Sequence, residues 1–75
     1  MLITEQFLID HGFKKIDYGD TPPYEAYEKH GIEIFNMNRL FWYSTALDQG
    51  GLQVEFMRID ELYDFFKGCK RNLYS

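Results

Sequence analysis

The sequence predicts a small α+β domain, in which an antiparallel meander of four to five strands carries an amino-terminal and a carboxyl-terminal helix on one face. Three observations lead to this fold class. Short runs rich in β-branched and aromatic residues, separated by glycine- or proline-containing turns, fill the middle of the chain. Signals for the start and end of a helix frame residues 4–11, and an apolar stripe with helical spacing runs through residues 59–73. A chain of 75 residues has room for one domain, residues 1–75.

The first helix is predicted over residues 4–11. Thr4 is a favourable N-cap residue, because its hydroxyl can accept a hydrogen bond from a free backbone N–H of the first turn. Gly12 suits the left-handed position that commonly follows a helix. We therefore expect a short helix that contributes Phe7 and Leu8 to the core.

Two strands are predicted at residues 13–18 and 24–29. Residues 19–23 must separate them, because they contain two consecutive prolines, which cannot donate hydrogen bonds to a sheet. Side chains alternate between the two faces of a strand, so Tyr27 should lie on the opposite face from Ala26.

A hairpin over residues 32–45, with its turn at residues 36–39, is the expected centre of the sheet. Large apolar side chains point to both faces of both of its strands. Ile32 and Ile34 oppose Phe35 and Met37 on the first strand, and Leu40 and Trp42 oppose Phe41 and Tyr43 on the second. Such a hairpin needs a cover on both sides.

The last strand and the last helix close the predicted fold. A turn at residues 48–51 leads into a half-buried strand with Leu52, Val54 and Phe56 on one face. The apolar stripe of the following helix recurs at spacings of 3 and 4 residues: Ile59, Leu62, Phe66, Cys69 and Leu73. Gly68 weakens this helix by about 1 kcal/mol relative to alanine. We expect a helix over residues 59–67 that extends toward Leu73.

Composition and motifs exclude several classes of function. The net charge of −4 disfavours nucleic-acid binding, which needs a basic surface, although Lys67, Lys70 and Arg71 lie close together in sequence. His11, His30 and Cys69 do not have the spacing of a zinc site, so no metal and no cofactor are expected.

Catalysis and membrane insertion are also disfavoured. Asp60, Glu61 and Asp64 sit near a helix start, where carboxylates are favoured by the helix dipole without any catalytic role. No nucleophile elbow or phosphate-binding glycine loop is present, so we expect no enzyme. The single cysteine and the lack of a long apolar segment predict a cytoplasmic protein.

The 19% content of aromatic residues suggests a binding surface. Two helices can cover only one face of a small sheet. One division puts Ile34, Trp42, Val54 and Phe56 in the core, and Phe35, Phe41, Tyr43 and Tyr27 on the face away from the helices. A register slip of one residue would exchange the faces and make Trp42 the exposed anchor. A third alternative is that all of these rings fill the core. The candidate partner-binding residues are Phe35, Phe41, Trp42, Tyr43 and Tyr27.

The two ends of the chain have recognisable patterns: Ile3-Thr4-Glu5, Leu8 and Gly12-Phe13 at one end, and Ile59-Asp60-Glu61-Leu62 and Phe65-Phe66 at the other. In these residues the chain resembles short uncharacterised proteins of bacteriophage and mobile-element genomes. The Pro22-Pro23 turn and the basic tail after Gly68 depart from that pattern. The resemblance implies a helix, a strand meander and a final helix. It also implies a setting in which small acidic proteins occupy a host protein, including defence nucleases.

These observations predict a non-enzymatic protein-binding module. Its partner would be another protein with a basic surface, and the resemblance suggests a phage-type inhibitor of a host or defence protein, such as a CRISPR nuclease, that acts by steric occupation. Two alternatives are a structural homodimer through an open aromatic sheet face and, less favoured, a nucleic-acid-binding module.

Overall fold

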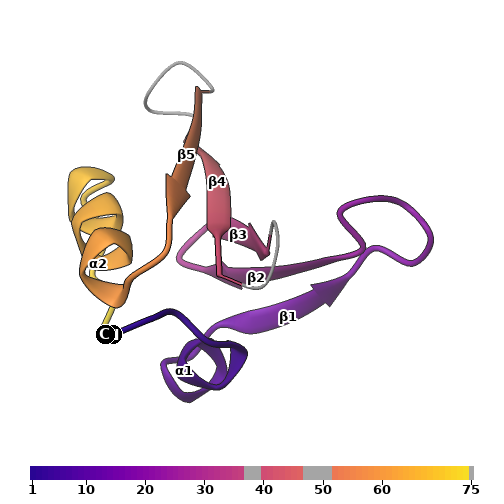
Figure 1. Cartoon of the computed structure of the whole chain (residues 1–75), viewed down its shortest axis with the longest axis horizontal. Helices are drawn as coiled ribbons and strands as arrows, with labels where there is room; N and C mark the ends of the chain where they lie inside the picture. Colours follow the sequence, from indigo (N-terminus) through magenta and orange to yellow (C-terminus); the bar gives the residue numbers. More distant parts are fainter. Residues whose placement is uncertain (37–39, 47–51, 75) are drawn as a thin grey trace.

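The computed structural model, which describes residues 1–36, 40–46 and 52–74, confirms the α+β fold (Figure 1). Five antiparallel strands pair in sequence order, β1-β2-β3-β4-β5, with one helix before and one helix after the sheet. The elements are α1 (Glu5–Asp10), β1 (Lys14–Asp17), β2 (Glu25–Lys29), β3 (Ile32–Asn36), β4 (Trp42–Ala46), β5 (Leu52–Phe56) and α2 (Ile59–Gly68).

The ends of α1 follow the local signals in the sequence. The Thr4 hydroxyl accepts a hydrogen bond from the backbone N–H of Phe7 at 3.1 Å, which makes Thr4 the N-cap. Gly12 adopts a φ of +87°, and the backbone N–H of Phe13 then bonds the carbonyl of Leu8 at 3.0 Å. This is the Schellman arrangement, and it turns the chain directly into β1.

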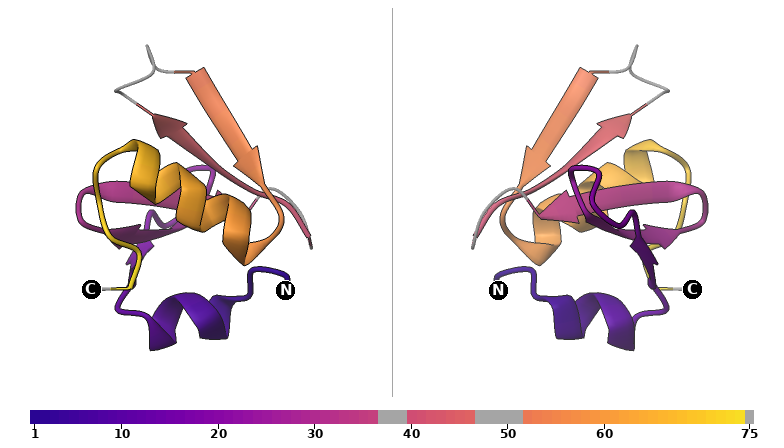
Figure 2. Two further views of the ribbon diagram at one scale, coloured as in Figure 1. Left: turned by 90° about the vertical axis from the view of Figure 1, so that its left-hand side faces the viewer. Right: turned by 90° about the vertical axis from the view of Figure 1, so that its right-hand side faces the viewer.

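The second helix ends at Gly68, before the predicted extension toward Leu73. Lys70 takes a left-handed conformation with a φ of +60°, and the backbone N–H of Arg71 bonds the carbonyl of Phe66 at 2.9 Å. The tail then runs back toward α1 (Figure 2). Leu73 is fully buried, so it reaches the core from this returning tail and not from a helix.

The strand register decides which side chains the helices cover. Tyr27 pairs with Ile34, and Trp42 pairs with Phe56, so these four side chains share the covered face. All four are buried. The predicted placement of Tyr27 on the face away from the helices is therefore wrong, because its cross-strand partner is the core residue Ile34.

The predicted hairpin begins its second strand later than expected. β4 starts at Trp42, so Leu40 and Phe41 precede the strand, and both are exposed. Most of its turn, at residues 37–39, lies outside the described residues, and so does the turn predicted at residues 48–51.

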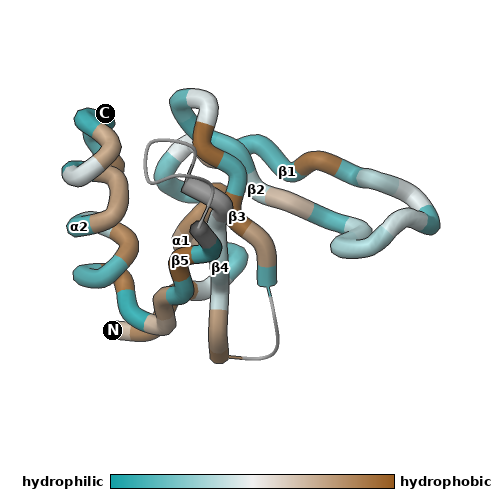
Figure 3. The backbone as a smooth tube through the Cα atoms, turned by 90° about the horizontal axis from the view of Figure 1, so that it is seen from above, coloured by the Kyte–Doolittle hydropathy of each residue, from teal (hydrophilic) through white to brown (hydrophobic). Residues whose placement is uncertain are grey.

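The core lies between the sheet and the two helices, and aromatic rings join the layers. The ring of Phe13 meets that of Phe66 edge to face at 5.6 Å, and Phe56 packs on Phe65 at 5.2 Å. Figure 3 shows the polar residues of α2 on the side away from the sheet and its apolar residues on the side toward it. The predicted apolar stripe of this helix thus packs on the strands.

A buried lysine holds the two ends of the chain to the sheet. Lys29 on β2 is only 8% exposed, and its Nζ donates to the backbone carbonyls of His11 and Leu73, the latter at 2.5 Å. Burial lowers the pKa of this ammonium group. The Nζ atom also lies 5.8 Å from the ring centroid of Phe13. One side chain therefore connects the end of α1 and the tail after α2 to the end of strand β2.

We expect Lys29→Met to destabilise the fold by about 2–3 kcal/mol, because one buried and one partly buried carbonyl lose a charged donor. The change in the free energy of unfolding can be measured by urea titration followed by circular dichroism. Lys14→Met is the matched control, since Lys14 is exposed on the neighbouring strand β1. Equal stability of the two variants would contradict the role given to Lys29.

Candidate functional site

One face of the sheet is covered by neither helix. The right-hand view of Figure 2 shows the strands in front of α2, with α1 below them. Ile16 pairs with Ala26, and Tyr43 pairs with both Phe35 and Glu55; alternation from the Glu28–Glu33 pair places both groups on this face. We call this side of the sheet the open face.

A stacked aromatic pair lies in the middle of the open face. Phe35 on β3 and Tyr43 on β4 are direct cross-strand partners. Their ring centroids are 5.1 Å apart with an interplanar angle of 28°, and both side chains are half-buried. Stacking fixes both rings, so they form a preorganised apolar surface on two adjacent strands.

Carboxylates surround the stacked pair. Glu28 and Glu33 are cross-strand neighbours, and Glu55 is the cross-strand partner of Tyr43. Like charges directly opposite each other are unfavourable in a sheet, so Glu28 and Glu33 add charge to this face at some cost in stability. The Tyr18 hydroxyl donates a hydrogen bond to Glu33, which raises the pKa of Tyr18. The open face is thus aromatic at its centre and mainly acidic around it.

The five predicted partner-binding residues lie in three different places. Phe35 and Tyr43 share the open face. Phe41 is 41% exposed but precedes β4, and its backbone carbonyl accepts a hydrogen bond from the Asn36 side chain at 3.2 Å. Tyr27 and Trp42 are buried on the helix-covered face, with their rings edge to face at 5.5 Å. Neither of these two can act as an exposed anchor.

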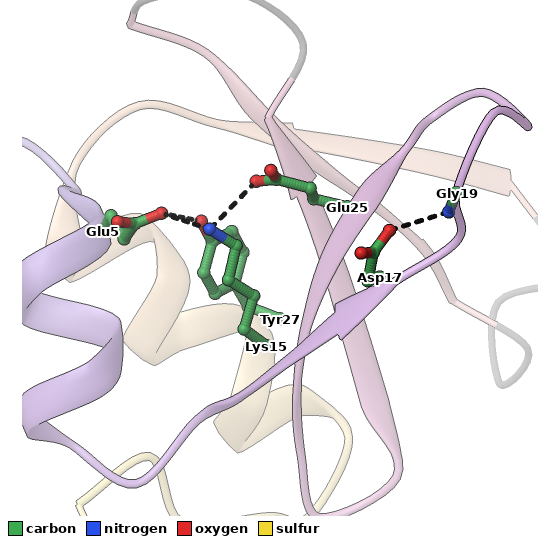
Figure 4. Close-up of polar contacts among 6 residues, drawn as sticks. All are labelled: Glu5, Lys15, Asp17, Gly19, Glu25 and Tyr27. Carbon is green, nitrogen blue, oxygen red and sulfur yellow. Dashed lines mark hydrogen bonds and ion pairs between the residues drawn. The ribbon is translucent and has the colours of Figure 1, made fainter.

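A polar cluster lies where α1 meets the first two strands (Figure 4). The Tyr27 hydroxyl donates to Glu5, and the ammonium of Lys15 lies 3.4 Å from Glu5 and 3.3 Å from Glu25. Burial, and then the bond to Glu5, raise the pKa of Tyr27. The hydrogen bond to Glu25 is the main reason that the pKa of Lys15 is raised. The sequence pattern does not predict this cluster, because it joins a helix residue to residues of two strands.

A hollow of about 590 Å³ adjoins this cluster. Its walls come from the start of α1, the β1–β2 connection, strand β2 and the paired ends of β3 and β4: Ile3, Thr4, Glu5, Pro23, Tyr24, Glu25, Tyr27, Asn36 and Trp42. We call it the Trp42 hollow. The indole Nε1–H of Trp42 is buried and has no hydrogen-bond partner among the residues that the structure describes.

Among the described residues, the candidate metal ligands His11, His30 and Cys69 do not form part of a metal-binding group. Within residues 1–36, 40–46 and 52–74, no three side chains of histidine, cysteine, aspartate or glutamate form a group that could hold a metal ion. Cys69 is buried in the core cluster, and the His11 ring stacks on Phe7 at 4.0 Å. Both residues therefore have structural contacts.

The charged groups of α2 serve its two ends. Glu61 accepts hydrogen bonds from the backbone N–H groups of Arg58 at 3.0 Å and Met57 at 3.3 Å, as part of a capping box. The Arg71 guanidinium donates to the carbonyls of Cys69 at 3.2 Å and Lys70 at 3.3 Å, beyond the other end of the helix. Glu61 and Arg71 thus have roles in the fold. Neither described helix is long and apolar enough to cross a membrane.

Comparison with protein-family models, curated proteins and solved structures finds no match to this chain.

The bond between Glu5 and Tyr27 makes stability depend on pH in the acid range. This hydrogen bond, followed by attraction to Lys15, lowers the pKa of Glu5 below its usual 4.5. The unfolded chain then binds more protons than the folded chain just below pH 4.5. The stabilisation is therefore present above pH 4.5 and is lost as the pH falls through the lowered pKa of the folded state.

We expect Glu5→Gln to be less stable than the wild type at neutral pH, with a difference that shrinks in acid. Urea titrations across this pH range measure the free energy of unfolding of both proteins. The control is Asp64→Asn, which removes an exposed carboxylate on α2. A difference between Glu5→Gln and wild type that stays constant with pH would contradict the role assigned to the ionised Glu5 carboxylate.

Proposed function

We propose that this chain is a non-enzymatic protein-binding module that covers a basic surface of its partner with the open face of its sheet. The observation that carries the proposal is the stacked pair of Phe35 and Tyr43, which lies half-buried on a face that neither helix covers. Aromatic side chains at the centre of an interface commonly supply most of its binding free energy.

The strands favour tight binding because they hold the rings in place. Phe35 and Tyr43 belong to adjacent strands of a five-stranded sheet and contact each other directly. Rigid rings lose little conformational entropy when a partner covers them. The module would therefore act by steric occupation, with little change in its own shape.

The charge of the open face indicates the kind of partner. Glu28, Glu33 and Glu55 lie on this face, where Lys14 is the basic residue opposite Glu28. Carboxylates around an apolar centre attract a partner with lysine or arginine side chains around a matching pocket, and they speed its association at low salt.

The resemblance at the two ends of the chain suggests a phage-type inhibitor of a host or defence protein as the specific role. A nuclease such as a CRISPR nuclease carries a basic channel for its nucleic acid. An acidic, aromatic face could occupy that channel and exclude the substrate. Steric exclusion requires no catalytic residue.

The same face is unsuited to a symmetric homodimer. In a dimer with twofold symmetry the same patch meets itself, so the carboxylates of the two copies would approach each other. We expect a monomer at micromolar concentration, which multi-angle light scattering measures directly. A dimer that dissociates on Tyr43→Ala substitution would show instead that the open face binds a second copy.

The partner test uses purified CRISPR nucleases and measures the cleavage of target DNA at increasing concentrations of this protein. We expect inhibition of a susceptible nuclease, with the inhibitory concentration raised at least about tenfold by Phe35→Ala combined with Tyr43→Ala, as for the loss of an interface hot spot. Circular dichroism checks that the double variant is folded. Tyr63→Ala is the control, because Tyr63 is 38% exposed on α2, away from the open face.

A charge variant tests whether the carboxylates of the open face attract a basic surface of the partner. Glu55→Lys leaves both rings in place, and we expect it to slow association and to weaken the salt dependence of binding. If no nuclease responds, a partner captured from cells must be purified and titrated with the same variants. Equal binding by wild type and the ring variants would rule out the open face as the interface.

A further inference from the structure

The Trp42 hollow has two features of a ligand site: a hydrogen-bond donor that is unpaired among the described residues, and an unbalanced negative charge. It lies on the helix-covered side of the sheet, so it is separate from the open face. Its volume of about 590 Å³ is within the range of sites for small ligands and side chains. Aromatic walls from Tyr24, Tyr27 and Trp42 are combined with the carboxylates of Glu5 and Glu25.

The first feature is an unused hydrogen-bond donor. Trp42 is 5% exposed, and its Nε1–H has no acceptor among the described residues. Buried indole N–H groups usually find a partner, because leaving a buried donor unpaired costs free energy. A ligand oxygen that accepted this hydrogen bond would remove that cost.

The second feature is an excess of negative charge. Lys15 contacts both Glu5 and Glu25, which leaves one unbalanced negative charge in this group of three. The Lys15 ammonium also lies 6.0 Å from the centroid of the Tyr27 ring. The protein itself thus places an alkylammonium group beside these carboxylates and this ring. A second cation would complete the balance of charge.

We infer that the Trp42 hollow binds a basic residue of a peptide, whose side-chain cation contacts Glu5 and Glu25 while its peptide carbonyl accepts from Trp42. A peptide residue with a flexible basic side chain carries both groups and can adjust the distance between them. The carbonyl would approach past Asn36, the cross-strand partner of Trp42. Asn36 is exposed, and its side chain would have to give up its 3.2 Å hydrogen bond to the carbonyl of Phe41 to make room.

Three small probes separate the parts of this proposal. N-acetyl-lysine methylamide has the cation and the carbonyls, N-acetyl-norleucine methylamide has only the carbonyls, and butylamine has only the cation. The chain contains one tryptophan, so ¹⁵N-labelled protein gives a single indole N–H resonance that reports on Trp42.

We expect the lysine probe to move the indole resonance downfield in a saturable way at millimolar concentration. The norleucine probe should bind at least about tenfold more weakly, because it lacks the charge-assisted contacts. Butylamine should shift signals near Glu25 but should not move the indole resonance downfield. An indole resonance that does not respond to the lysine probe, or responds equally to the norleucine probe, would overturn the proposal.

Variants link the response to the site. Glu25→Gln should weaken binding of the lysine probe, and its side chain is half exposed, so the fold should tolerate the change. Glu55→Gln, on the open face, is the matched control and should bind like the wild type. The double variant Phe35→Ala, Tyr43→Ala should also keep this binding. The experiments therefore test the ligand site in the Trp42 hollow and the proposed interface on the open face independently of each other.

Discussion

The hydrogen bonds of Lys29 are the interaction on which the rest of this structure depends. Its buried ammonium joins β2 to the carbonyl that ends α1 and to a carbonyl of the tail after α2. Both helical ends are thereby drawn to the same side of the sheet. A consequence is that the other side carries Phe35 and Tyr43 without a helix over them. The face opposite these contacts is the one that is available as the proposed interface.

Local signals predicted the fold well because they act through the backbone of a few neighbouring residues. Thr4 and Gly12 set the limits of α1 by hydrogen bonds and by a left-handed conformation, both of which are readable from residue type. The first run of α2, predicted over residues 59–67, was also correct to within one residue, because the helix ends at Gly68; the extension toward Leu73 does not form, and Lys70 takes a left-handed conformation instead. Leu73 is buried as predicted, but it lies in the tail after α2, which the helical spacing of apolar residues does not predict.

The candidate site was only partly predictable, because alternation within a strand does not say which face a helix will cover. Phe35 and Tyr43 were correctly grouped, since adjacent strands with this register place them opposite each other. Tyr27 was placed on the wrong face, because its pairing with Ile34 depends on a register that the sequence does not reveal. The Trp42 hollow was not predicted at all, since its walls come from four separate parts of the chain.

The sequential order of the strands has a consequence for how this chain folds. Every strand pairs with its neighbour in sequence, so each hairpin closes a short loop at little cost in entropy. The bond from Lys29 to Leu73, in contrast, joins residues that are 44 positions apart. We expect the meander to assemble first and the two ends to dock on it afterwards, an order that pulsed amide-exchange during refolding can measure. Early protection of the tail would reverse that order.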